Sequence, residues 1–300
     1  MEKKLLSGYY AALLTPFHDG GGINAGSLGA LVDHVISTGL DGLYVGGSTG
    51  EAFLMQPEER KTLLRQTAEA AGGRTMLIAH VGDINQRLSL DLIETAVEAG
   101  YDAVSAVPPF YYGFSFAEIK AHYQALASAS DLPFLVYNFP ALSGVRFSTG
   151  QLAELMSLPN VVGVKNTCSD HYALERLRRE MPDKTILNGF DETLLAGLAL
   201  GADGGVGSTY NVQADKVLAL ASAYAKGNVE RARGIQVQMN KLIDVLVTHG
   251  VNSSLKYLLE LRGIPMGSCR APIAPLGTEA KKALEAAAER LLGEPAEVEV

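Results

Sequence analysis

Eight short apolar segments alternate with amphipathic segments over residues 1–225. Apolar runs of this length are typical of buried strands in a parallel sheet. These predicted strands are Tyr10–Leu14, Gly42–Val45, Thr75–Ala79, Ala103–Ala106, Pro133–Tyr137, Val161–Lys165, Thr185–Leu187 and Gly204–Gly207. The pattern predicts a closed α/β fold, the (β/α)8 TIM barrel. A doubly wound open sheet is the structural alternative, but its glycine-rich dinucleotide turn is missing from the sequence.

The segments between the predicted strands have apolar residues at helical spacing. They are Ser27–Thr38, Pro57–Ala70, Leu88–Ala99, Phe116–Ala129, Thr149–Ser157, Tyr172–Glu180 and Asp191–Leu200. Gly39, Gly100 and Gly201 stand just before the next strand, where a left-handed helix C-cap requires glycine. The positions of these glycines support repeated strand-then-helix units.

Beyond the eighth strand the sequence contains helical patterns alone. Val212–Ala225 is expected to be the last helix of the barrel, and Val229–His249, Ser253–Leu261 and Thr278–Leu292 follow it. We therefore predict a barrel over residues 1–225 and a C-terminal helical extension, packed on the barrel, over residues 226–300. The last residues, 293–300, are expected to form a frayed tail.

The composition argues against several classes of function. The net charge is −8 and Lys and Arg do not cluster, so nucleic acid is not expected as a partner. No segment approaches the roughly 20 apolar residues of a membrane helix, and the first residues lack the apolar stretch of a signal peptide. Cys168, Cys269 and the six scattered histidines have no metal-ligand spacing, so neither a metal nor another cofactor is expected. These features predict a cytoplasmic protein that acts on small molecules.

Two predicted strands end in side chains that can carry out chemistry. Lys165 closes Val161–Lys165, and Tyr137 closes Pro133–Tyr137. Partial desolvation at the mouth of a barrel favours the neutral amine of a lysine, and such an amine can form a Schiff base with a carbonyl. A tyrosine can move the proton that this chemistry needs. The alternative interpretation of Lys165 is a lysine with a packed stem and a solvated ammonium group.

Polar loops follow other predicted strands and would meet at the same end of the barrel. Gly46–Glu51 (GGSTGE) combines glycines with hydroxyl and backbone donors that suit a carboxylate. Pro108–Gly113 is a stiff aromatic loop, Asn188–Glu192 carries two adjacent acids, and Gly207–Tyr210 carries hydroxyls. Each loop alone is also compatible with an ordinary turn, a helix start or a surface contact. Together they predict a Schiff-base pocket with a carboxylate clamp on one side.

The chain resembles the dihydrodipicolinate synthase and N-acetylneuraminate lyase family of pyruvate-dependent class I enzymes. Gly46–Glu51, Tyr137–Asn138 followed by Pro140 and Gly144, and Lys165 carry the resemblance, which extends from about Leu5 to about Leu292. Tyr137–Gly144 (YNFPALSG) and Asn188–Glu192 (NGFDE) resemble the members that cleave N-acetylneuraminate into N-acetylmannosamine and pyruvate. Dihydrodipicolinate synthases usually carry an arginine where this chain has Ala141–Ser143. The resemblance therefore favours a polyol substrate.

The resemblance also implies roles for individual residues. Lys165 would form the Schiff base, Tyr137 would relay a proton, and Ser48 and Thr49 would hold the carboxylate. Five further residues would bind the hydroxylated tail of the sugar: Thr167, Gly189, Asp191, Glu192 and Ser208. Tyr111 would reach the site from a neighbouring subunit of a homotetramer. Two positions depart from the family pattern, Pro108 in the aromatic loop and Phe190 beside the acids.

Two other functions remain open from the sequence alone. One is a related pyruvate-dependent enzyme, either a 2-keto-3-deoxy sugar-acid aldolase or a dihydrodipicolinate synthase, in which the aldehyde differs. The other is a non-catalytic barrel that binds a sugar acid. The presence of both Lys165 and Tyr137 argues against this second alternative, because binding alone requires neither residue.

Overall fold

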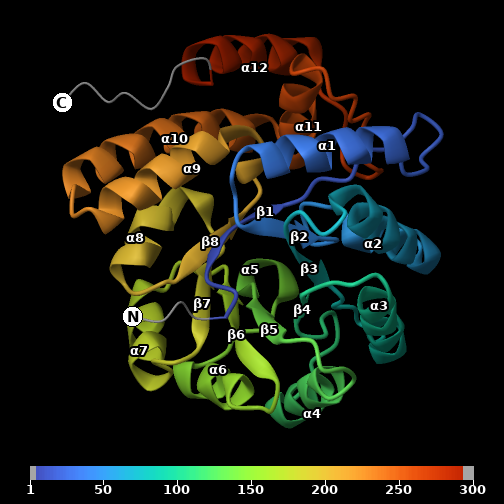
Figure 1. Ribbon diagram of the computed structural model, residues 1–300, viewed down its shortest axis with the longest axis vertical. Coiled ribbons are helices and arrows are strands. Elements are labelled where there is room, and N and C mark those ends of the chain that lie inside the picture. Colours follow the sequence, from blue (N-terminus) through green and yellow to red (C-terminus); the bar gives the residue numbers. More distant parts are fainter. Residues whose placement is uncertain (1–4, 293–300) are drawn as a thin grey trace.

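The computed structural model describes residues 5–292, in which eight parallel strands close into one barrel in sequence order (Figure 1). The strands are β1 (Gly8–Ala12), β2 (Gly42–Val45), β3 (Met76–His80), β4 (Ala103–Ala106), β5 (Phe134–Asn138), β6 (Val161–Asn166), β7 (Thr185–Asn188) and β8 (Gly204–Gly207). The last strand, β8, pairs with β1. The predicted (β/α)8 fold is thus confirmed. The tail expected over residues 293–300 lies outside the described residues.

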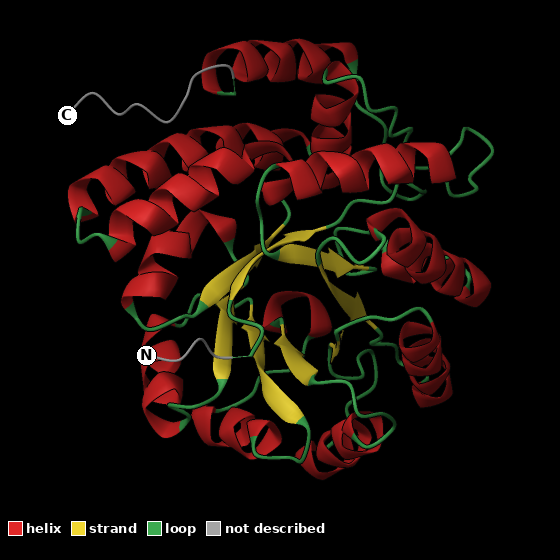
Figure 2. Cartoon of the chain, viewed as in Figure 1, coloured by secondary structure: helices red, strands yellow, loops and turns green. Residues whose placement is uncertain are grey.

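Helices surround the strands on the outside of the barrel, except the short α5, which lies over the middle of the ring of strands in this view (Figure 2). The α-helices are α1 (Ala25–Ser37), α2 (Pro57–Ala71), α3 (Gln86–Glu98), α4 (Phe116–Ala127), α5 (Pro140–Ser143), α6 (Thr149–Met156), α7 (His171–Glu180), α8 (Leu194–Ala199), α9 (Tyr210–Ala225), α10 (Val229–His249), α11 (Val251–Leu261) and α12 (Thr278–Leu291). Two short 3-10 helices are η1 (Ala52–Leu54) and η2 (Asp191–Thr193). Within residues 5–292, none of these helices has the length and apolar character needed to cross a membrane.

The helix predicted over Asp191–Leu200 is divided in the structure. It begins as η2 and continues as α8. The Asp191 carboxylate is buried and accepts hydrogen bonds from the backbone N–H and the hydroxyl of Thr209, at 2.8 and 2.6 Å. These bonds hold the start of the segment against the loop after β8, so it does not begin as a regular α-helix.

The apolar core has two layers, which follow from the alternation of side chains along each strand. In β1, Tyr10 and Ala12 point into the barrel, where they pack with Tyr44 and Leu135, while Ala11 packs in the outer layer between strands and helices. The inner layer fills the barrel, so it is a packed core and not a channel. Ligands can therefore enter only at the strand ends.

The C-terminal helices cover one side of the barrel (Figure 1). Helix α10 packs along α9 and also contacts η2, and α11 and α12 pack against α10 and against each other. Because η2 follows β7 at the C-terminal end of the barrel, this packing brings α10 close to the expected active site.

Candidate active site

Lys165 and Tyr137 lie side by side near the C-terminal ends of β6 and β5. They are direct partners in the strand register. The Lys165 side chain is buried, and its Nζ lies 4.0 Å from the ring centroids of both Tyr137 and Tyr44. The amine is therefore placed between two aromatic faces at the open end of a packed barrel.

This environment changes the protonation of Lys165. Burial, which removes water from the ammonium, lowers the pKa of Lys165 to about 7, against an opposing effect of the Asp191 carboxylate. At neutral pH a large fraction of the side chain is therefore the neutral amine, the form that attacks a carbonyl. The alternative interpretation, a solvated strand-end ammonium, does not fit a side chain that is 4% exposed.

Tyr137 is protonated at neutral pH. Burial raises its pKa to about 12, and the nearby hydroxyls of Ser48 and Thr167 act in the opposite direction. A phenol in this state can accept a proton only if it passes its own proton on. Ser48 stands where it can take part in such a transfer.

A side-chain hydrogen bond joins the ends of β5 and β6 in addition to their backbone pairing. Asn138 Nδ2 donates a buried hydrogen bond of 2.7 Å to Asn166 Oδ1. His80 of β3 closes the other side of Tyr137, with ring centroids 5.9 Å apart, and its Nδ1 lies 2.9 Å from the Gly46 carbonyl oxygen. Burial lowers the pKa of His80 well below its usual value, so this ring is neutral. Tyr137 is thus held on both sides.

The turn after β2 presents Ser48 and Thr49 to the cavity. It begins at Gly46, whose φ of +70° favours glycine, and Thr15 Oγ1 donates a buried hydrogen bond of 2.8 Å to the Gly50 carbonyl. Ser48 and Thr49 remain partly exposed between these fixed points. Their hydroxyls are therefore available to a ligand on a turn that is itself held in place.

One cavity of about 390 Å³ contains the predicted site residues, with the exception of Tyr111. Its lining includes Ser48, Thr49, Tyr137, Lys165, Thr167, Gly189, Asp191, Glu192 and Ser208. Lys165 is the one basic side chain among the described lining residues. A ligand with one carboxylate and several hydroxyls suits this distribution of charge.

The two adjacent acids have different environments. Asp191 is buried and bound by Thr209, and burial raises its pKa to about 6. Glu192 is exposed to the cavity mouth. Of the two, Glu192 is therefore better placed to accept hydrogen bonds from substrate hydroxyls, whereas Asp191 also holds the wall of the cavity together.

Gly189 permits a close contact with Thr167. A Cβ at position 189 would lie 1.9 Å from Thr167 Oγ1, so a side chain there would displace the threonine. Phe190, one of the two departures from the family pattern, lines the cavity and stands edge-on to Phe139 with ring centroids 6.0 Å apart. Its ring therefore contributes to the cavity wall without a hydroxyl.

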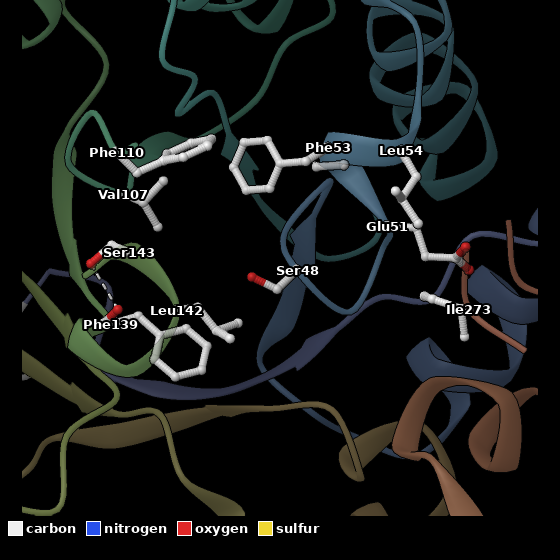
Figure 3. A pocket seen from close by; sticks show the side chains of 11 residues that line it. Ser48, Glu51, Phe53, Leu54, Val107, Phe110, Phe139, Leu142, Ser143 and Ile273 are labelled. Carbon is white, nitrogen blue, oxygen red and sulfur yellow. Dashed lines mark hydrogen bonds between the residues drawn. The ribbon is translucent and has the colours of Figure 1, made fainter. Parts of the chain in front are cut away.

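An apolar cavity of about 180 Å³ adjoins the first one (Figure 3). The two share Ser48, Phe139 and Leu142. Figure 3 shows the Ser48 hydroxyl directed into a space bordered by Phe53 and Phe110. Ser48 thus stands between an apolar compartment and the compartment that contains Lys165.

Tyr111 does not enter the cavity of its own chain. Its side chain is 87% exposed, its φ is +76°, and its ring packs edge-on against Tyr112. It lines a separate surface hollow together with Arg146. Within one chain, Tyr111 therefore cannot act with Tyr137.

The sequence did not reveal some residues of the site. Tyr44 contacts the Lys165 amine, and its place two residues before Gly46 on an inward-facing strand position could have indicated this. The wall formed by α10 and the start of α11 had no sequence signal. It comprises Ile243, Leu246, Val247, Val251 and Asn252. Over residues 5–292 the structure contains no cluster of acidic, histidine and cysteine side chains suited to a metal ion.

Comparison with known proteins agrees with the geometry. The model of the dihydrodipicolinate synthetase family matches residues 5–291. The chain belongs to this family. It is 48% identical over 267 residues to the N-acetylneuraminate lyase of Rhizobium meliloti, with 89% of each chain covered.

Solved structures of the family superpose closely on the chain. A structure of CdNal from Clostridium difficile in complex with mannosamine has a TM-score of 0.94 at 36% identity, covering 96% of this chain and 100% of that one. The N-acetylneuraminate lyase of Fusobacterium nucleatum complexed with pyruvate has a TM-score of 0.92 at 35% identity, covering 97% and 100%. The predicted family is thus confirmed.

Proposed function

We propose that the chain is a class I aldolase that cleaves N-acetylneuraminate into N-acetylmannosamine and pyruvate and also catalyses the reverse addition. The observation that carries this proposal is the buried Lys165 amine, with a pKa of about 7, beside Tyr137 in a cavity that also contains a carboxylate-binding turn. The names of the family relatives and structural neighbours support the same activity.

The Schiff base forms at one end of the cavity. The neutral Lys165 amine attacks the C2 carbonyl of the open-chain sugar acid, and loss of water leaves an iminium group. Ser48 and Thr49 hold the C1 carboxylate through hydroxyl and backbone donors. The two contacts orient C2 toward Nζ and keep the acid from leaving before the carbon–carbon bond breaks.

Cleavage requires proton transfer from the C4 hydroxyl. Tyr137 accepts this proton as it passes its own to Ser48, and Ser48 passes its own to the C1 carboxylate that it binds, because a phenol with a pKa of about 12 is not a ready-made base. The C3–C4 bonding electrons move into the iminium and leave an enamine of pyruvate, while the aldehyde of N-acetylmannosamine departs. The proton held by the relay is then returned to C3 of the enamine, and hydrolysis of the resulting iminium releases pyruvate and the free Lys165 amine.

The rest of the cavity favours a polyol over a second carboxylate. Thr167, Gly189, Glu192 and Ser208 offer hydroxyl, backbone and carboxylate groups to the tail of the sugar. Arg146 is exposed and lines the surface hollow beside Tyr111, away from Lys165. A substrate with a second carboxylate, as formed from aspartate semialdehyde, would meet carboxylates without a balancing cation.

We also propose a homotetramer in which Tyr111 completes the site of a neighbouring subunit. Phe53 and Leu142 are exposed and line the apolar cavity next to Ser48, and the exposed Tyr111 and Tyr112 line the surface hollow that shares Leu142 with it. Exposed groups of this kind mark protein contact surfaces. A partner's Tyr111 that entered this cavity would extend the proton relay from Tyr137 through Ser48.

The decisive experiment compares substrates on the purified protein. We expect release of pyruvate from N-acetylneuraminate and condensation of pyruvate with N-acetylmannosamine, but not with aspartate semialdehyde. Hydride reduction in the presence of pyruvate should trap one adduct per chain on Lys165, and Lys165→Ala should abolish it. Condensation with aspartate semialdehyde, or an adduct on Lys184 or Lys256, would overturn the proposal.

A further inference from the structure

A buried ion pair lies behind the turn that carries Ser48 and Thr49. Glu51 Oε1 is 2.6 Å from Lys256 Nζ, and the two side chains are 0% and 2% exposed. Glu51 Oε2 also accepts a hydrogen bond of 2.7 Å from the backbone N–H of Arg270. A buried charge is tolerated only when it is paired and hydrogen-bonded, so each partner depends on the other.

Glu51 belongs to the same turn as Ser48. Its backbone N–H donates to the Ser48 carbonyl at 3.1 Å, and its own φ is +61°, in the left-handed region. A residue other than glycine adopts this conformation at a cost of about 1 kcal/mol or more, so other contacts must stabilise it. The ion pair with Lys256 and the hydrogen bond from the Arg270 N–H to the Glu51 carboxylate supply this stabilisation.

The same C-terminal region holds the turn at further points. Asn252 Nδ2 lies 3.4 Å from the Thr49 carbonyl oxygen, and the Arg270 guanidinium donates to the Leu54 carbonyl at 3.1 Å. The Phe17 ring is in contact with both cations, with Lys256 Nζ at 4.4 Å and the Arg270 guanidinium carbon at 4.3 Å from its centroid. Residues of the segment 252–270 therefore contact the chain at Thr49, at Glu51 and at Leu54.

We propose that the Lys256–Glu51 ion pair is a positioning device that enables the Ser48–Thr49 turn to bind the substrate carboxylate. The inference rests on the proposed function, in which Ser48 and Thr49 bind that group. Lys256 acts through Glu51 and does not touch the substrate. The C-terminal extension, which contains α11, therefore positions the turn that binds the substrate carboxylate.

Loss of the ion pair would weaken binding of the substrate carboxylate for two reasons, both of which follow from the position of Glu51 behind the turn. Figure 3 shows the Ser48 hydroxyl directed into the cavity and the Glu51 carboxylate directed away from it. Loss of Lys256 would leave a buried, unbalanced negative charge behind a turn that must receive an anion, and like charges repel strongly at low dielectric. It would also release the strained Glu51 backbone, which shares a hydrogen bond with Ser48. Lys165 lies on β6, outside this network.

The test compares two ketones that differ in the carboxylate. Pyruvate and hydroxyacetone each form a Schiff base that hydride reduction can trap, and half-saturation of trapping is measured for both. The variants are Glu51→Gln, which keeps the size of the side chain and an acceptor for Arg270, and Lys256→Met. Lys216→Met is the matched control, because Lys216 is also buried and its Nζ donates to the Leu291 carbonyl at 2.7 Å, away from the turn.

We expect Lys256→Met to raise the half-saturation concentration of pyruvate about tenfold, a change of about 1.4 kcal/mol. Glu51→Gln loses the ion pair that holds the turn but leaves no unpaired negative charge behind it, so its half-saturation concentration of pyruvate should rise less, about threefold. Neither variant should change that of hydroxyacetone. Lys216→Met should change neither. If Lys256→Met does not fold, Glu51→Gln alone decides the question. Equal losses for both ketones, or no loss for pyruvate, would overturn the inference. Failure of the wild-type protein to prefer pyruvate over hydroxyacetone would instead overturn the carboxylate role of Ser48 and Thr49.

Discussion

The Lys165 amine lies 4.0 Å from the centre of the Tyr137 ring, and the two residues are direct register partners on β6 and β5. One strand pair therefore sets both the position of the nucleophile and that of the proton-transfer group. The Asn138–Asn166 hydrogen bond, one residue further along the same strands, prevents the two ends from moving apart. A shift of either strand by one residue would turn its functional side chain out of the barrel and leave the other without its partner.

The first prediction concerns pH. Because burial lowers the pKa of Lys165 to about 7, the neutral amine increases as pH rises through 7. The initial rate of pyruvate trapping, measured by intact mass at saturating reductant, should therefore rise with a midpoint near pH 7 and level off above it. Asp191 raises this pKa, so Asp191→Asn should move the midpoint to lower pH. A midpoint near that of an ordinary lysine would contradict the assignment.

The second prediction separates Schiff-base formation from bond cleavage. Tyr137→Phe keeps the ring beside Lys165 but removes the group that moves the C4 proton. Cleavage of N-acetylneuraminate should fall by about 100-fold or more, whereas trapping of pyruvate should continue. Tyr44→Phe is the matched control, because its hydroxyl donates to Ser105 Oγ at 3.0 Å inside the barrel. Comparable loss of turnover in both variants would indicate a packing role for Tyr137.

The third prediction distinguishes the two adjacent acids. Glu192→Ala should lower kcat/KM for N-acetylneuraminate by a factor that corresponds to about 1–3 kcal/mol, because substrate hydroxyls lose a charged acceptor. Its pyruvate trapping and melting temperature should hardly change. Asp191→Ala should also lower the melting temperature, since it removes the acceptor of two Thr209 hydrogen bonds. An equal loss of trapping and cleavage in Glu192→Ala would indicate a structural role.

The sequence was sufficient to predict features that depend on local pattern. Strand length and glycine spacing indicated the barrel, and the barrel placed Lys165, Tyr137 and the polar loops at one end. The sequence was insufficient to predict features that depend on packing between distant segments. The Lys256–Glu51 ion pair and the wall from α10 join residues that no motif connects. The different environments of Asp191 and Glu192 depend on Thr209, which lies on another loop.

The last prediction concerns the sharing of the site between subunits. Tyr111 is 87% exposed in one chain and lies outside the cavity that contains Tyr137, so it can take part only from a neighbour. Tyr111→Phe should keep the fold and the oligomer, as judged by light scattering, and lose much of the turnover. Tyr112→Phe, on the same loop and 65% exposed, is the matched control and should remain active.

Co-expression of Tyr111→Phe with Lys165→Ala then tests the exchange directly. In mixed oligomers, some sites combine an intact Lys165 and Tyr137 from one subunit with an intact Tyr111 from its neighbour. Those sites should recover activity well above that of either parent. Hybrids whose activity equals the weighted mean of the parents would show that Tyr111 does not complete a neighbouring site, because no arrangement of subunits would then restore the relay through Ser48.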